Sequence, residues 1–210
     1  MIRVSVHPLA PAGAFLLLFA TAPVRAFAAV SSVLLHEGGH ALAARFFRLR
    51  VRRVMLMPVG IRMDLETPRS YLEEAVVAAA GPAMNFLYAG AARLTGTALA
   101  EEILLFSLTL AFLNLLPIRT FDGGRLLHAV LAPRFGERTA EGALAVTTAA
   151  SFSVLWTLSL YLFFYSTANG ALLLFCAVLF VFLTVKNGGT ACVSSKTVLQ
   201  SKKNRKGIFL

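Results

Sequence analysis

The sequence predicts an α-helical integral membrane protein with about six transmembrane helices and a small membrane-associated β-hairpin between the second and third helices. Hydrophobic residues make up 58% of the 210 residues and charged residues only 14%, whereas about a quarter of a soluble domain is charged. The charges are also clustered, which leaves four long uncharged stretches at 4–24, 75–92, 103–118 and 142–185. A soluble helical core is the alternative, but soluble helices alternate polar and apolar faces.

The uncharged stretches are close to or above the length of a bilayer span, which needs roughly 20 mostly apolar residues. The stretch 142–185 is long enough for two spans, and its polar segment 166–170 predicts the turn between them. Residues 26–47 complete the six, although they contain histidines and a glutamate. The apolar start also resembles a secretory signal, but its prolines and the span that follows favour an uncleaved first helix.

The segment 51–65, VRRVMLMPVGIRMDL, predicts the hairpin. Apolar and charged residues alternate from Ile61 to Leu65, which is the periodicity of a strand. Pro58 and Gly60 interrupt the segment where a turn is needed. An irregular loop at the membrane interface is the alternative interpretation.

The net charge of +10 suggests at first a nucleic-acid partner, but its distribution indicates a membrane orientation instead. With six spans, 18 of the 20 basic residues fall in segments on one side of the membrane: 1–8, 45–70, 119–140 and 186–210. Only Arg25 and Arg93 lie on the other side. The positive-inside rule then predicts a multi-pass protein of the cell membrane with both termini in the cytoplasm. The lipid bilayer is the expected partner, and nucleic acid is not.

The chain shows no internal repeat and one expected membrane domain, residues 1–190. Residues 191–210 are polar and basic, which predicts a mobile cytoplasmic tail held near anionic lipid.

His36, Glu37 and His40 form the pattern H-E-x-x-H within LLHEGGHALA. On a helix, His36 and His40 project from one face a turn apart and can bind one zinc ion, while Glu37 can activate the water nucleophile as a general base. Paired structural histidines are the alternative, but they leave an ionisable glutamate in the bilayer without a task. Gly38 and Gly39 weaken the helix, so we expect another segment to pack against this turn.

Catalytic zinc takes three protein ligands, and Asp122 is the candidate for the third. The chain has only two aspartates, and the other, Asp64, lies in the hairpin segment. Asp122 lies in the stretch NLLPIRTFDGG, in which Pro117 is expected to break the fourth helix. The second and fourth spans run in the same direction, so His36 and Asp122 can meet at similar depth. A helix cap is the alternative role for Asp122.

Two asparagines and one further histidine are weaker candidates. Asn85, in the stretch GPAMN, and Asn114 could bind the substrate backbone or stabilise an oxyanion, and helix packing is an equal alternative for each. Pro82, in the same stretch, frees a backbone carbonyl. His128 is interpreted as a cytoplasmic surface residue rather than a ligand.

HEGGH, GPAMN and N-x-x-P…DGG, in this order over six spans, resemble the site-2 protease family of intramembrane zinc metalloproteases. The compact arrangement of the spans and the segment LMPVGIRMDL are most similar to the stage IV sporulation protein FB branch. The resemblance implies zinc ligands His36, His40 and Asp122, and Glu37 as the catalytic base. It also places Asn85 and Asn114 near the active centre.

The same resemblance implies a membrane-associated protein substrate, specifically a sigma factor precursor, and inhibitory membrane protein partners. The chain departs from the branch at Thr120, where a second proline is usual, so the contour that faces the substrate differs there. A non-catalytic zinc-binding membrane protein or zinc transporter is the alternative from another functional class. A transporter needs further ligands towards the far side, and the outer halves of the spans offer almost none.

Overall fold

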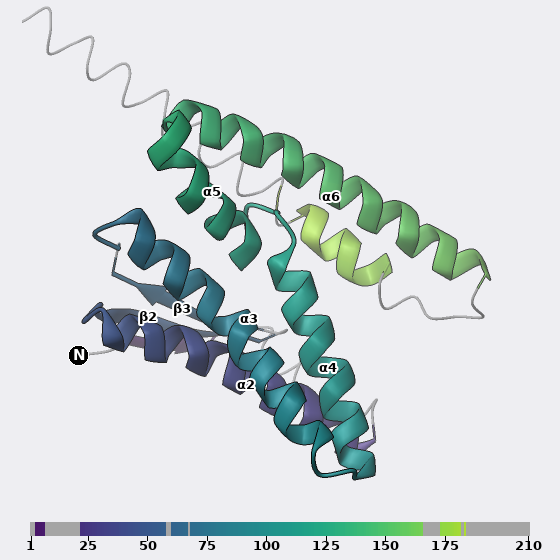
Figure 1. Cartoon of the computed structure of the whole chain (residues 1–210). Helices are drawn as coiled ribbons and strands as arrows, with labels where there is room; N and C mark the ends of the chain where they lie inside the picture. Colours follow the sequence, from purple (N-terminus) through teal and green to yellow (C-terminus); the bar gives the residue numbers. More distant parts are fainter. Residues whose placement is uncertain are drawn as a thin grey trace, which may run out of the picture. The chain divides into compact units, whose positions relative to one another are not determined.

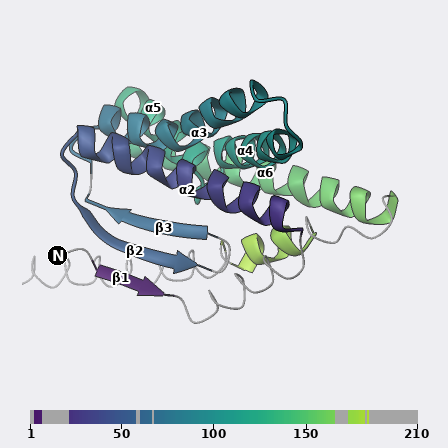
Figure 2. The ribbon, with the colours of Figure 1, turned by 90° about the horizontal axis from the view of Figure 1, so that it is seen from below.

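The structure is a computed structural model, and it describes residues 3–6, 22–57, 60–66, 68–165, 173–181 and 183. Five helices and three strands carry labels in Figure 1 or Figure 2: β1 (Arg3–Val6), α2 (Pro23–Phe46), β2 (Val51–Met57), β3 (Gly60–Leu65), α3 (Tyr71–Arg93), α4 (Ala98–Leu115), α5 (Asp122–Phe135) and α6 (Glu137–Tyr165). The chain divides into two compact units, residues 1–151 and residues 152–210. This boundary falls inside α6 and was not predicted. The predicted basic tail, 191–210, lies outside the described residues.

Helices α2 and α3 are antiparallel neighbours in the first unit. His40, near the end of α2, contacts Val77 near the start of α3, whereas Ser31 accepts a hydrogen bond from the Tyr88 hydroxyl further along α3. Helix α3 also contacts α4 and α5, so it is the central helix of the unit (Figure 1).

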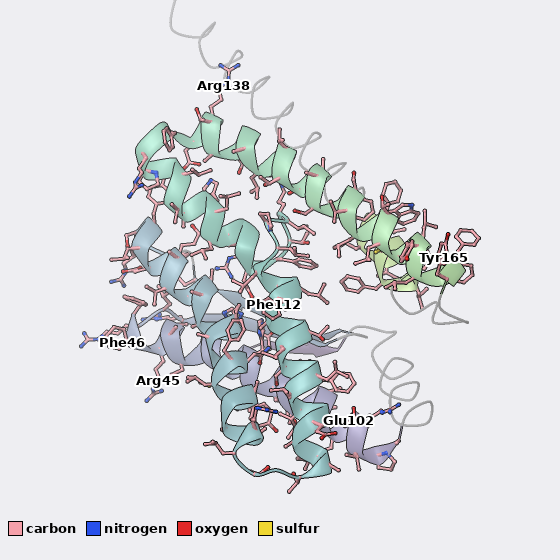
Figure 3. All side chains as sticks on the ribbon, turned by 45° about the vertical axis from the view of Figure 1, so that its right-hand side comes forward. Arg45, Phe46, Glu102, Phe112, Arg138 and Tyr165 are labelled. Carbon is pink, nitrogen blue, oxygen red and sulfur yellow. The ribbon has the colours of Figure 1, made fainter. Side chains whose placement is uncertain are left out.

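Helices α2 and α4 run in the same direction, as the sequence predicts for the second and fourth spans. Arg25 pairs with Glu102 at the start of both helices, and Ser32 shares a buried hydrogen bond of 2.8 Å with Ser107 further along. Figure 3 shows Arg45, at the other end of α2, far from Glu102. The parallel arrangement brings the second half of α2 to the end of α4.

Three strands form a sheet in the order β1-β2-β3, which lies alongside α2 in Figure 2. Strands β2 and β3 pair antiparallel and occupy the segment for which the sequence predicts a hairpin. Strand β1 pairs parallel with β2, with Arg3 opposite Arg53. The sequence did not predict this third strand, which lies within residues 1–8, the segment assigned to the cytoplasmic side.

By length and composition, three helices of the described chain could each cross a membrane: α3, α4 and α6. They correspond to the predicted spans at 75–92 and 103–118 and to the first part of 142–185. Helix α2 is long enough, with 24 residues, but its serines, glycines and HEGGH residues make it less apolar. Most of the stretch 4–24 and the segment 166–172 lie outside the described residues. The number of six spans therefore stays a prediction.

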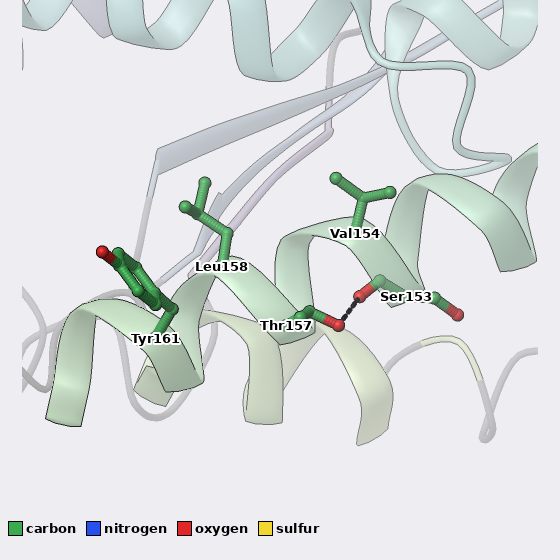
Figure 4. A pocket seen from close by; sticks show the side chains of 5 residues that line it. All are labelled: Ser153, Val154, Thr157, Leu158 and Tyr161. Atoms are coloured by element: carbon green, nitrogen blue, oxygen red, sulfur yellow. Dashed lines mark hydrogen bonds between the residues drawn. The ribbon is translucent and has the colours of Figure 1, made fainter. Parts of the chain in front are cut away.

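The second unit contains the end of α6 and the helical residues 173–181. Figure 4 shows a groove along α6, lined by Ser153, Val154, Thr157, Leu158 and Tyr161. The Thr157 hydroxyl donates to the Ser153 carbonyl at 2.9 Å, which leaves the lining largely apolar. This groove has no metal ligand or catalytic carboxylate, so it is not a candidate active site.

Candidate metal centre

His36, His40 and Asp122 meet in one buried cluster. The Nε2 atom of His36 lies 3.1 Å from Oδ2 of Asp122 and 3.2 Å from Nε2 of His40. Nε2 of His40 lies 3.2 Å from the same oxygen of Asp122. Three potential ligand atoms from two distant segments therefore form a nearly equilateral triangle.

The cluster is almost closed to solvent, since His36, His40 and Asp122 are 4%, 7% and 8% exposed. Burial by itself would raise the pKa of the Asp122 carboxyl, but the hydrogen bonds to His36 and His40 outweigh it and lower the pKa to about 2. The carboxylate is therefore ionised at neutral pH and presents only acceptor oxygens. Its second oxygen, Oδ1, lies 3.9 Å from Nη1 of Arg125.

Helix α2 places the two histidines on one face, as four-residue spacing requires. Glu37 follows His36 and is only partly buried. It lies near enough to interact electrostatically with His36, His40 and Asp122. Among the described residues it has no hydrogen-bond partner, so its carboxylate stays available for a ligand or water.

Two glycines let α3 approach this face of α2. A Cβ on Gly39 would lie 2.5 Å from the Ala80 carbonyl oxygen, whereas a Cβ on Gly38 would meet nothing within 4 Å. The prediction that a segment packs against the glycine pair therefore holds at Gly39 and not at Gly38. Across the interface, a Cβ on Gly81 would collide with the His40 ring and the His36 ring. Gly81 of GPAMN thus provides the space in which the imidazoles lie.

Helix α3 also contacts the outer nitrogen of each imidazole. Nδ1 of His40 lies 2.7 Å from the Val77 carbonyl oxygen. A carbonyl only accepts, so Nδ1 of His40 carries the proton and Nε2 is free to bind a metal. Nδ1 of His36 lies 3.2 Å from Nδ2 of Asn85, which is fully buried. Pro82 has no backbone N–H, so the Ala78 carbonyl has no donor from its own helix. His40 contacts the neighbouring carbonyl of Val77 instead.

The segment between α4 and α5 positions Asp122 beside the two histidines. Helix α4 ends at Leu115, two residues before Pro117, and α5 begins with Asp122 itself. A Cβ on Gly123 would collide with the Leu115 carbonyl, and one on Gly124 would collide with the carbonyl of Ile118. The glycine pair therefore allows the first turn of α5 to pack directly on the preceding backbone. Asp122 lies inside the helix rather than at its cap, Phe121.

The remaining candidates lie apart from the cluster or beside it. Asn114 donates through Nδ2 to the Leu110 carbonyl of its own helix, at 3.0 Å, so this contact is internal to α4. His128 pairs with Glu137 at 2.9 Å and takes no part in the triangle. The Val77 carbonyl and Gly81 were missed by sequence reasoning, because only the packing of α2 on α3 gives them a role. The glycine of GPAMN was the available signal for Gly81.

The donor set and its spacing fit a zinc ion. Ligands at about 2.0–2.1 Å from a tetrahedral zinc lie about 3.3–3.4 Å apart, close to the 3.1 and 3.2 Å sides of this triangle. Two imidazoles with a carboxylate make a ligand set of catalytic zinc sites. Among the described residues, this is also the one group of three such side chains close enough to share an ion.

Comparisons with known proteins agree with this geometry. The chain is 36% identical over 108 residues to stage IV sporulation protein FB of Bacillus subtilis, a match covering 48% of this chain and 38% of that protein. It is 30% identical over 115 residues to a zinc metalloprotease of Methanocaldococcus jannaschii, covering 50% of this chain and 33% of that protein. The matched part thus spans only about a third of the length of either relative.

The fold is also found in a solved structure, a site-2 protease from Methanocaldococcus jannaschii. The TM-score is 0.66 at 21% sequence identity, and the match covers 89% of this chain and 90% of that one. Peptidase family M50 matches residues 25–101 and 91–158, which include nearly all of α2 and the whole of α3, α4 and α5, and hence the whole histidine–aspartate cluster. Since this match covers more than half of the sequence, the chain belongs to Peptidase family M50.

Proposed function

We propose that the chain is an intramembrane zinc metalloprotease that hydrolyses a peptide bond of a membrane-associated protein. The observation that carries this proposal is the convergence of His36, His40 and Asp122, whose ligand atoms lie within 4.8 Å of one another. Membership of Peptidase family M50 supports it. The similarity to a protein named as a zinc metalloprotease supports the choice of metal.

In this proposal His36 and His40 each offer Nε2 to zinc, and Asp122 offers its carboxylate. Zinc, when bound, supplies a Lewis acid that polarises the scissile carbonyl and lowers the pKa of water towards about 7. The three side chains hold the site on two rigid helices, α2 and the first turn of α5. Their burial keeps bulk water away, which strengthens electrostatic interactions with the reacting groups.

Glu37 acts as the general base and then as the general acid. Its carboxylate takes a proton from the water molecule whose oxygen forms the new bond to the carbonyl carbon. It then passes that proton to the nitrogen of the leaving amine as the carbon–nitrogen bond breaks. Its position one residue after His36, with a partly exposed carboxylate and no hydrogen-bond partner among the described residues, supports both tasks.

The proposed substrate is a sigma factor precursor held at the membrane. Similarity to stage IV sporulation protein FB supports this substrate class and membrane proteins as inhibitory partners. A helical substrate must unwind before cleavage, because a helix hides its carbonyls. The sheet that contacts α2 through β3 offers an edge along which an extended substrate strand can pair. Asn114 remains a predicted substrate contact.

We also propose a multi-pass orientation with both termini in the cytoplasm. Arg45 and Arg69 flank the sheet next to the metal-binding half of α2, whereas Arg25 and Arg93 lie at the opposite helix ends. The positive-inside rule then assigns the metal-binding end to the cytoplasmic side.

Cleavage by the reconstituted protein tests the proposed activity. The chain is placed in liposomes with a single-span sigma factor precursor that carries a different tag on each side of its membrane segment. We expect two tagged fragments with the wild type and none with Glu37→Gln. An intact precursor with the zinc-loaded wild type, together with zinc uptake into the liposomes, would overturn the protease in favour of a transporter.

A further inference from the structure

Asn85 contains a buried polar atom whose partner is missing among the described residues. The side chain is 0% exposed, and its carbonyl oxygen, Oδ1, accepts no hydrogen bond there. A buried acceptor without a donor is costly to the folded state, so the unpaired oxygen calls for a physical reason. Its other polar atom, Nδ2, faces Nδ1 of His36 at 3.2 Å.

The proton required on His36 shows which amide atom suits this contact. A neutral imidazole that gives Nε2 to a metal carries its proton on Nδ1, and that N–H then needs an acceptor. Oδ1 of Asn85 is such an acceptor. It is bonded to the same carbon as Nδ2, the atom that faces Nδ1 of His36. A half-turn of the amide about χ2 exchanges Nδ2 and Oδ1 within the same space.

His40 provides the precedent within the same site. Its Nδ1 lies 2.7 Å from the Val77 carbonyl oxygen, an acceptor from the same helix as Asn85. Metal-binding histidines usually donate their outer N–H to a carboxylate, a carbonyl or water, and loss of that acceptor typically weakens metal binding about 10–100-fold. Helix α3 would thus supply one carbonyl acceptor to each imidazole, from the backbone for His40 and from a side chain for His36.

We propose that Asn85 is a positioning residue whose Oδ1 accepts the Nδ1–H of His36 and thereby orients His36 as a metal ligand. This inference rests on the proposed zinc site, and it gives Asn85 a different role from substrate binding or oxyanion stabilisation. Those two roles need the amide N–H groups to face the substrate. The positioning role needs only an acceptor that faces His36.

Two substitutions separate these roles. Asn85→Asp keeps an acceptor and removes the donor, whereas Asn85→Leu keeps the approximate size and removes both. Tyr88→Phe is the matched control, because it removes a hydrogen bond to Ser31 from the same helix and leaves the cluster intact. The full chain is purified in detergent, and the dissociation constant for zinc is measured by competition with a chelator of known affinity.

We expect Asn85→Leu to weaken zinc binding about 10–100-fold, while Asn85→Asp and Tyr88→Phe stay within a few-fold of the wild type. Unchanged zinc affinity in a folded Asn85→Leu variant would overturn the inference. Asn85→Asp that binds zinc as weakly as Asn85→Leu would also overturn it. Asp122→Ala is measured beside them: zinc affinity lost there but kept in Asn85→Leu refutes only the role of Asn85. Full affinity in Asp122→Ala refutes the zinc site and this inference together.

A measurement on the unmodified chain covers the case in which Asn85→Leu fails to fold. With ¹⁵N-labelled histidine and zinc bound, NMR reports which nitrogen of each imidazole is protonated. We expect a hydrogen-bonded proton on Nδ1 of His36, as on Nδ1 of His40. An Nδ1 of His36 that carries no proton would contradict the inference.

Discussion

Nε2 of His36 and Oδ2 of Asp122 lie 3.1 Å apart, although 86 residues separate them in the chain. The contact joins the middle of α2 to the first residue of α5. It depends on the parallel course of α2 and α4 and on the break after α4, because both are needed to bring Asp122 to the depth of His36. A metal bound at this contact therefore links two segments that the backbone connects only through β2, β3, α3 and α4.

Zinc removal should lower the melting temperature of the wild type. A ligand that binds only the folded chain stabilises it by about 4 kcal/mol at a concentration a thousand times its dissociation constant. Thermal unfolding in detergent, with and without a chelator, measures the effect. Asp122→Ala is the control and should show no zinc-dependent shift. Equal melting temperatures for zinc-loaded and chelator-treated wild type would contradict the structural link.

Glu37→Gln should keep the fold and bound zinc, and it should abolish cleavage. Glutamine preserves the size of the side chain but cannot accept the proton, and a lost general base typically costs about 10²–10⁴-fold in rate. Glu102→Gln is the matched control, because Glu102 pairs with Arg25 at the other end of α2. Processing of a tagged substrate is followed on gels. Detectable cleavage by Glu37→Gln would remove Glu37 as the base.

Gly81→Ala should weaken zinc binding strongly, because the new Cβ would occupy the space of the His40 and His36 rings. Gly90→Ala, on the same helix, is the control, since a Cβ there meets nothing within 4 Å. The control should bind zinc normally and gain up to about 1 kcal/mol of helix stability. The two dissociation constants for zinc are compared in detergent. Equal values would show that α3 does not confine the imidazoles as described.

Gly39→Ala and Gly38→Ala should differ although they are adjacent. The Cβ of the first would lie 2.5 Å from the Ala80 carbonyl oxygen, which belongs to helix backbone and cannot move aside, whereas the second meets nothing. Overpacking of this kind costs typically about 1–3 kcal/mol, so Gly39→Ala should unfold at lower temperature than the wild type. Gly38→Ala should be neutral or slightly stabilising. A reversed order of the melting temperatures would contradict the packing of α2 on α3.

The meeting of His36, His40 and Asp122 in one cluster was predictable from the sequence. HEGGH fixes His36 and His40 on one helical face whatever surrounds them, and the small number of aspartates left Asp122 as the strongest third ligand. The shared direction of α2 and α4 followed from counting spans. The strand character of 51–65 followed from its alternation of apolar and charged residues.

The parts that could not be predicted depend on contacts between segments. Strand β1 is four residues long and forms through its pairing with β2. So short a segment does not predict a strand from its own sequence. The Val77 carbonyl is a backbone group that every residue type has, so the sequence cannot single it out. The difference between Gly38 and Gly39 arises only from the side of α2 on which α3 packs.

The most direct test of the central claim is the zinc content per chain of detergent-purified wild type, Glu37→Gln and Asp122→Ala, because it needs no knowledge of the substrate. We predict about one zinc per chain in the first two and a clear loss in the third, which would make Asp122 a ligand and leave Glu37 free for proton transfer. Full zinc retention by Asp122→Ala would contradict the account, because the contact between α2 and α5 would then not be a metal site.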